Sequence, residues 1–138
     1  MRKALIVDDE GPIRNLIAAV LKRERIPAST APNGIEALDL LRKETFACVV
    51  LDLMMPVMNG REVIEEMLHH RVPRIPVIVV TASGEGGTAD LDPEVVKVII
   101  RKPFDVARVV EAVRAFCSDD ADEELDASWP ADAPRVTM

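Results

Sequence analysis

Four short apolar runs in this chain each end next to side chains that can bind a metal ion or a phosphoryl group. Runs of this length are typical of strands that are buried on both faces of a parallel sheet. The carboxyl ends of such strands lie along one edge, where ligands bind in open α/β sheets. The runs are Ala4-Leu5-Ile6-Val7, Cys48-Val49-Val50-Leu51, Val77-Ile78-Val79-Val80 and Val98-Ile99-Ile100-Arg101, and they are followed by Asp8 and Asp9, Asp52, Thr81 and Lys102.

Helical patterns separate these runs. The first follows Gly11-Pro12, where proline suits the first turn of a helix, and its apolar residues recur at the spacing of one helix face. Asn33 is suited to cap a second helix, a third follows Gly60, and a last one extends from about Asp105 to Phe116. Strict alternation predicts an α/β fold with five parallel strands, helices on both faces and right-handed crossovers.

The segment between Thr81 and Val95 does not fit a firm amphipathic helix. It contains several glycines, one proline and a single large apolar residue, Leu91. We therefore expect the fourth helix to be short or irregular, or to be replaced by a mobile loop.

Composition divides the chain into two parts. Aliphatic residues dominate an apolar share of 49%, and 138 residues suit one domain, which we place at 1–117. The acidic segment 118–138 has no periodicity, so we expect disorder there. No basic stripe indicates nucleic-acid binding, and no apolar stretch is long enough to cross a membrane. Without a signal peptide, the chain is expected to be cytoplasmic.

The two cysteines are far apart in sequence. Cys48 lies in a predicted buried strand and Cys117 near the end of a predicted helix. We interpret both as small buried hydrophobic residues, because disulfides are rare in a reducing cytosol.

The expected pocket has the composition of a magnesium-dependent phosphoryl-transfer site. Asp52 is the candidate nucleophile, since a carboxylate can attack a phosphoryl group to form an acyl phosphate. Asp8 and Asp9 would repel it unless a divalent cation were bound, and Mg²⁺ prefers oxygen ligands. Thr81 offers a hydroxyl donor and Lys102 a mobile ammonium for the phosphoryl oxygens.

The sequence resembles the response-regulator receiver domains of two-component signalling. The matching motifs cover about 1–117 and are Ile6-Val7-Asp8-Asp9-Glu10, Asp52-Leu53-Met54-Met55-Pro56-Val57-Met58-Asn59-Gly60, Thr81-Ala82 and Lys102-Pro103-Phe104. The resemblance implies a flavodoxin-like, CheY-like sheet of order 2-1-3-4-5. It also implies phosphoryl transfer from a phosphohistidine to Asp52, Mg²⁺ held by Asp8, Asp9, Asp52 and the Met54 carbonyl, and a cis Lys102–Pro103 bond.

Two features depart from the family pattern. Ile99 stands where the family has an aromatic residue that swings inward, and Val95-Val96-Lys97 replaces the usual Gly-Ala-Asp segment. We therefore hypothesise that phosphorylation orders the glycine-rich segment 83–90 instead of rotating an aromatic side chain.

The resemblance implies a phosphorelay protein whose partners are a sensor histidine kinase or phosphotransfer protein and an unknown downstream protein, with a phosphorylation-dependent dimer left open. No second domain follows in this sequence, so output is expected through protein contacts. The alternatives are a receiver-like scaffold that acts without phosphorylation and, less favoured, an aspartate-based phosphatase. Such phosphatases carry a second acid two residues after the nucleophile, where this chain has Met54. We expect no enzyme activity beyond its own phosphorylation and dephosphorylation.

Overall fold

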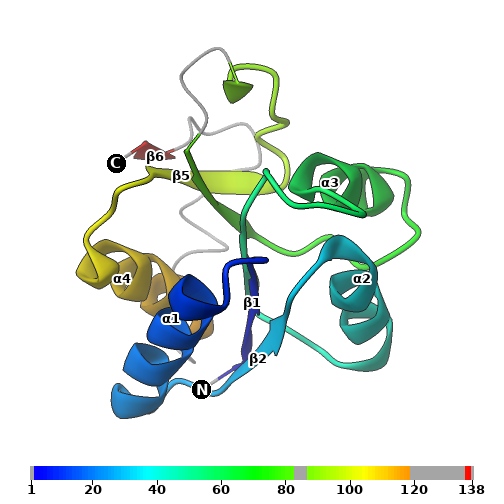
Figure 1. The fold of residues 1–138 in the computed structure, drawn as a ribbon. Coiled ribbons are helices and arrows are strands. Elements are labelled where there is room, and N and C mark those ends of the chain that lie inside the picture. The colour runs from blue at the N-terminus through cyan, green and yellow to red at the C-terminus, as the bar shows by residue number, and fades with distance from the viewer. Residues whose placement is uncertain (1, 83–86, 119–135, 138) are drawn as a thin grey trace.

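A computed structural model describes residues 2–82, 87–118 and 136–137 as a parallel sheet between two layers of helices (Figure 1). Helices α1 and α4 cover one face, and α2 and α3 cover the other. The strands are β1 (Ala4–Val7), β2 (Ala28–Ala31), β3 (Cys48–Leu51), β4 (Val77–Thr81), β5 (Val96–Arg101) and β6 (Val136–Thr137). The helices are α1 (Gly11–Arg23), α2 (Gly34–Lys43), α3 (Gly60–Leu68) and α4 (Val106–Cys117).

The strand order is β2-β1-β3-β4-β5-β6, which confirms the predicted order 2-1-3-4-5 for the first five strands. Along β1, Leu5 and Val7 belong to the core cluster beneath α2 and α3, whereas Ala4 and Ile6 belong to the cluster beneath α1 and α4. Because successive side chains point to opposite faces and both faces are covered, a central strand must be apolar at every position. This explains the uninterrupted apolar runs.

Helices α2, α3 and α4 each begin after a residue whose side chain accepts a backbone hydrogen bond, whereas α1 has no such cap. Asn33 accepts from the Glu36 N–H at 2.9 Å, as its predicted capping role requires. Asn59 and Glu62 form a reciprocal capping box at the start of α3. These caps fix the start of the two helices that follow β2 and β3, and α3 begins directly after the loop from Asp52.

The segment between β4 and β5 contains turns and no α-helix in its described residues, 82 and 87–95. This agrees with the expectation of an irregular fourth helix, so the helix expected from Asp105 to Phe116 is α4. Leu91 and Val95 pack in the same core cluster as Ile99, which is 3% exposed. Residues 83–86 of the segment that we hypothesise to order on phosphorylation lie outside the described residues.

Most of the acidic segment, residues 119–135 and 138, also lies outside the described part of the chain. Val136 and Thr137 are an exception to the expected disorder, because they form β6 parallel to β5, with Val136 opposite Val98 and Thr137 opposite Ile99. Within the described residues, none of the helices combines the length and the apolar character that a membrane crossing needs.

Candidate functional site

The carboxyl ends of four adjacent strands bring the sequence-predicted groups to one edge of the sheet. Asp8 follows β1, Asp52 follows β3, Thr81 ends β4 and Lys102 follows β5. Backbone hydrogen bonds extend the pairing past the strand ends, because the Asp52 N–H donates to the Val7 carbonyl at 3.0 Å and the Lys102 N–H donates to the Thr81 carbonyl at 2.8 Å. The strand pairing therefore holds these four residues side by side.

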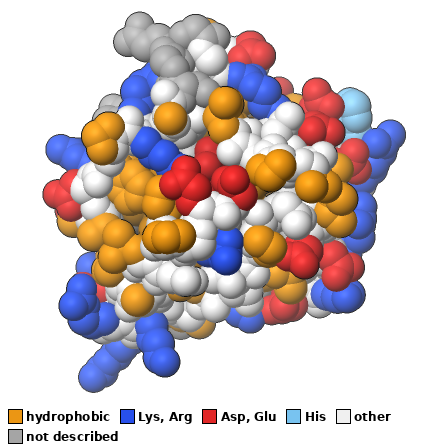
Figure 2. Space-filling view, in the orientation of Figure 1, with side chains coloured by type: hydrophobic (Ala, Val, Ile, Leu, Met, Phe, Trp, Pro, Cys, Tyr) orange, Lys and Arg blue, Asp and Glu red, His pale blue; other side chains and the backbone are white. Residues whose placement is uncertain are grey.

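Lys102 lies among three carboxylates. Its Nζ is 3.0 Å from Asp52 Oδ2, 3.3 Å from Asp8 Oδ2 and 3.6 Å from Glu10 Oε1. One carboxylate oxygen from each of these three acids lies within 4.8 Å of the others. Such a cluster of hard oxygen donors fits a small divalent cation. Figure 2 shows acidic side chains near the middle of one face, with hydrophobic side chains on both sides of them.

Backbone amides hold the two buried carboxylates in place. Asp8 Oδ1 accepts from the Glu10 N–H at 2.9 Å, and Asp52 Oδ1 accepts from the Met54 N–H at 3.0 Å. In both cases the other oxygen, Oδ2, is the one that meets Lys102. Each carboxylate is therefore oriented through one oxygen and presents the other to the pocket.

Burial and neighbouring charges shift the pKa values of Asp52 and Lys102 in the pocket. Burial raises the pKa of Asp52 above its usual range, even though the hydrogen bonds from Met54 and Lys102 oppose this shift. For Lys102, burial lowers the pKa, but the hydrogen bond and charge of Asp52, together with Asp8, outweigh burial and raise it. Lys102 therefore stays protonated at neutral pH, where it can bind an anion.

The second acid of the Asp8-Asp9 pair is placed differently from the first. Asp8 is 2% exposed, whereas Asp9 is exposed and does not belong to the set of three carboxylates found among the described residues. Glu10 occupies that place, although the sequence pattern alone did not mark it as a site residue. Its position inside the motif Asp8-Asp9-Glu10 is the signal that could have pointed to it.

The other predicted site residues lie around this cluster. Thr81 is fully buried at the end of β4, next to the Lys102 backbone. Met54 donates its backbone N–H to Asp52, and its side chain is 65% exposed. The Lys102–Pro103 bond is cis, which confirms that expectation.

Gly60 allows the loop after Asp52 to fold back against the end of β3. A Cβ atom at Gly60 would lie 2.4 Å from the Asp52 carbonyl oxygen and 2.8 Å from the Leu53 Cα. The Gly60 N–H also donates to the Leu53 carbonyl at 3.1 Å. No larger residue fits there without moving the backbone that carries Asp52.

A largely apolar groove of about 710 Å³ lies beside Lys102. Ile13 and Leu16 of α1 line one part of it, and Phe104 and Val106 line another. Leu16 is 50% exposed and shares this lining with the partly buried Ile13 and Phe104, so apolar side chains are grouped there. The groove therefore offers a surface on which a partner could dock next to the acidic cluster.

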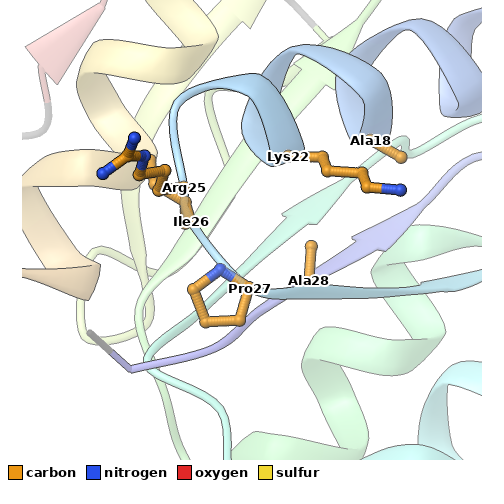
Figure 3. A pocket seen from close by; sticks show the side chains of 6 residues that line it. All are labelled: Ala18, Lys22, Arg25, Ile26, Pro27 and Ala28. Carbon is orange, nitrogen blue, oxygen red and sulfur yellow. The ribbon is translucent and has the colours of Figure 1, made fainter.

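A second hollow of about 430 Å³ lies between the end of α1 and β2 (Figure 3). Lys22 and Arg25 line it, but their side chains point in different directions. Since its charged groups do not converge, we assign it no ligand.

Comparison with known proteins identifies the family. The chain matches the family model described as the response regulator receiver domain over residues 4–114. It is 38% identical over 118 residues to the transcriptional regulatory protein SrrA of Staphylococcus aureus, which covers 81% of this chain and 46% of that protein. The chain thus spans about half the length of the curated relatives it matches.

Solved structures agree with this match. The response regulator TrrA from Thermotoga maritima, in complex with Mg²⁺-BeF, is 31% identical with a TM-score of 0.73, covering 84% of this chain and 99% of that one. A CheY-like receiver domain protein from Methanospirillum hungatei JF-1 has a TM-score of 0.77 at 23% identity, over 93% and 99% of the two chains, and supports the flavodoxin-like fold alone. The chain therefore belongs to the response regulator receiver domain family of two-component systems.

Proposed function

We propose that Asp52 accepts a phosphoryl group from the phosphohistidine of a sensor histidine kinase or phosphotransfer protein in a Mg²⁺-dependent reaction. The observation that carries this proposal is the contact of Lys102 Nζ with Asp52 Oδ2 at 3.0 Å and with Asp8 Oδ2 at 3.3 Å. This contact places a cation directly beside the candidate nucleophile, at the edge of the sheet where ligands bind.

The chemistry follows from the positions of the side chains. An Asp52 carboxylate oxygen forms a bond to phosphorus as the bond from phosphorus to the donor imidazole breaks, which yields an acyl phosphate. Lys102 then exchanges its carboxylate contacts for phosphoryl oxygens, and the Thr81 hydroxyl donates to another of them. A bound Mg²⁺ would neutralise the charge of the acids and of the phosphoryl group.

Asp8, Asp9, Asp52 and the Met54 carbonyl are the proposed Mg²⁺ ligands. The donor set fits the cation, because all four offer oxygen and Asp8 and Asp52 already present an oxygen each to one point. Glu10 is the competing candidate for the place of Asp9, since its carboxylate is the one that meets them.

Matched variants distinguish these two acids. Asp9→Asn and Glu10→Gln each remove one charge and keep the shape of the side chain. We expect Asp9→Asn to raise the Mg²⁺ concentration for half-maximal phosphorylation by at least about tenfold, because even the loss of an outer-shell partner typically costs this much, and Glu10→Gln to change it little. A large effect of Glu10→Gln on the Mg²⁺ requirement, with little effect of Asp9→Asn, would identify Glu10 as the ligand.

Membership of the receiver domain family supports the proposal that the chain interacts with a histidine kinase or phosphotransfer protein and with a downstream target. The apolar groove beside Lys102 is the docking site that we propose for the phosphodonor, because Ile13 and Leu16 border the pocket there. An unknown downstream protein, a phosphorylation-dependent dimer and a cytoplasmic location remain proposals that rest on the family. The boundary between the receiver domain, 1–117, and the acidic segment, 118–138, is a proposal as well.

A direct test is phosphoryl uptake from a small acyl-phosphate donor, followed by intact-protein mass spectrometry. We expect one phosphoryl group on the wild-type protein with Mg²⁺ and none with a chelator. Asp52→Asn should take up none, whereas Asp39→Asn, a matched change at an exposed aspartate on α2, should behave as wild type. Uptake by the Asp52→Asn variant would place the nucleophile elsewhere.

A receiver-like scaffold that acts without phosphorylation is the second candidate. It is favoured by the turns that replace an α-helix in the described residues between β4 and β5, and by Ile99, which is buried where the family has a mobile aromatic residue. A wild-type protein that remains folded but takes up no phosphoryl group from either a small donor or a phosphohistidine protein would support this candidate.

A further inference from the structure

The two cysteine thiols meet at the end of the sheet opposite the acidic cluster. Cys48 is the first residue of β3 and Cys117 is the last residue of α4, and their Sγ atoms are 3.8 Å apart. Both side chains are fully buried. Asp52 follows the other end of β3, so this contact is separate from the proposed phosphoryl-transfer site.

Arg2 holds the end of α4 against the first strand. Its backbone N–H donates to the Cys117 carbonyl at 2.9 Å, and its Nη2 donates to the Phe116 carbonyl at 3.0 Å. The carboxyl end of a helix normally disfavours an anion, because its last carbonyls carry partial negative charge. Arg2 binds two of these carbonyls and brings a positive charge to the same place.

The surroundings of the two thiols shift their pKa values in different directions. The hydrogen bond with Cys48 lowers the pKa of Cys117, and the charge of Arg2 adds to this effect, although burial opposes it. The same hydrogen bond, together with burial, raises the pKa of Cys48. Because Arg2 contacts the Cys117 backbone and its charge favours a thiolate there, Cys117 is the expected nucleophile, although either sulfur can be the donor in the contact between them.

We propose that Cys48 and Cys117 form an oxidisable dithiol that hydrogen peroxide converts into an intramolecular disulfide. The Cys117 thiolate attacks one peroxide oxygen, the O–O bond breaks, and the released hydroxide takes up a proton to become water. The Cys48 sulfur then attacks the sulfenic acid on Cys117, and the S–S bond forms as a second water leaves. Two thiols and one peroxide thus give one disulfide and two waters.

The geometry requires only a small movement. The sulfurs must approach from 3.8 Å to about 2.0 Å, the length of a disulfide bond, and they already face each other within one core cluster. Hydrogen peroxide can reach the buried sulfurs when the structure opens locally beside Arg2, an exposed residue near the start of the chain. The bond would fasten the end of α4 to the start of β3.

The test uses the reduced full chain and hydrogen peroxide. We expect the protein to lose two hydrogens in mass, to lose both free thiols in an alkylation assay after denaturation, and to yield a Cys48–Cys117 cross-linked peptide. Dithiothreitol should reverse all three changes. The oxidised protein should melt at a higher temperature and still take up one phosphoryl group, because Asp52 lies at the other end of β3.

Two variants assign the roles of the sulfurs. Cys48→Ala should leave a sulfenic acid on Cys117 that dimedone captures, whereas Cys117→Ala should leave Cys48 reduced at the same peroxide dose. Arg2→Gln should slow the loss of thiols several-fold. Circular dichroism checks that the alanine variants fold; if either does not, the cross-link map of the wild-type protein decides.

Either of two results would overturn the proposal. One is that both wild-type thiols remain open to alkylation at peroxide doses that oxidise a free thiol. The other is that the products carry added oxygen, or join two chains, without a Cys48–Cys117 bond within one chain.

Discussion

Val57, in the loop that follows Asp52, has a backbone conformation that a β-branched residue rarely adopts. Its φ is 71°, and the Met58 N–H donates to the Pro56 carbonyl at 2.9 Å across it, which is the hydrogen bond of a strained γ-turn. The side chain is 77% exposed, so little burial compensates for this strain. We predict that Val57→Gly stabilises the protein.

The size of the effect follows from three terms. Relief of the strained backbone gains about 1–3 kcal/mol. The freedom of glycine in the unfolded chain costs about 0.5–1 kcal/mol. Loss of the quarter of the valine that is buried costs roughly 0.5 kcal/mol. The middle of each range gives a net gain of about 0.75 kcal/mol, which corresponds to a rise in the melting temperature of about 2–4 °C for a chain of this size.

Urea unfolding of metal-free protein, followed by circular dichroism, measures this difference. Val57→Thr is the matched control, because it keeps the β-branched shape and the strain, and we expect its stability to equal that of the wild type. A loss of stability on Val57→Gly, or an equal gain on Val57→Thr, would refute the argument from backbone strain.

Three further predictions concern the loops and the acidic cluster. Gly60→Ala should destabilise the protein by about 2–3 kcal/mol in urea unfolding and slow phosphoryl uptake, because the added Cβ would collide with the backbone of Asp52 and Leu53; wild-type values would contradict this. The raised pKa of Asp52 means that the folded state binds a proton more tightly than the unfolded state. The free energy of unfolding therefore falls as the pH rises from the ordinary value of 3.8 to the folded pKa, and it falls no further above that pKa. Asp52→Asn should therefore be more stable than wild type at neutral pH without metal and should show a flatter pH profile of unfolding free energy, and an unchanged profile would count against it. His70→Gly should gain about 0.5–1 kcal/mol, because His70 has φ 59° at the end of α3 where glycine is preferred; a thermal melt that shows a loss would contradict this.

The sequence was sufficient to predict the central strands and the edge where the site lies. Strands β1, β3, β4 and β5 are covered on both faces, so each one is a continuous apolar run that can be recognised. In contrast, β2 is Ala-Ser-Thr-Ala at the edge of the sheet and only partly buried, so no apolar run marks it and only the alternation implies it. The strand β6 pairs through its backbone at the opposite edge, and two residues give too short a pattern to recognise.

The sequence predicted which residues at the strand ends come together, but not which neighbouring carboxylate joins them. Asp8, Asp52 and Lys102 follow directly from strands, so parallel pairing alone brings them together. The choice between Asp9 and Glu10 depends on how the loop turns into α1, where the Glu10 N–H donates to Asp8 Oδ1. The contact between Cys48 and Cys117 depends on how the end of α4 packs against the sheet, and the sequence holds no local signal for it.

The proposed function depends above all on Asp52 being the residue that receives the phosphoryl group. Borohydride reduces an aspartyl phosphate and leaves a free aspartate unchanged, so peptide mass spectrometry after phosphorylation with Mg²⁺ reads the acceptor directly. We predict reduction at Asp52, with Asp8 and Asp9 intact. Reduction at Asp8 or Asp9, or none anywhere in a folded protein given a phosphohistidine donor, would contradict it.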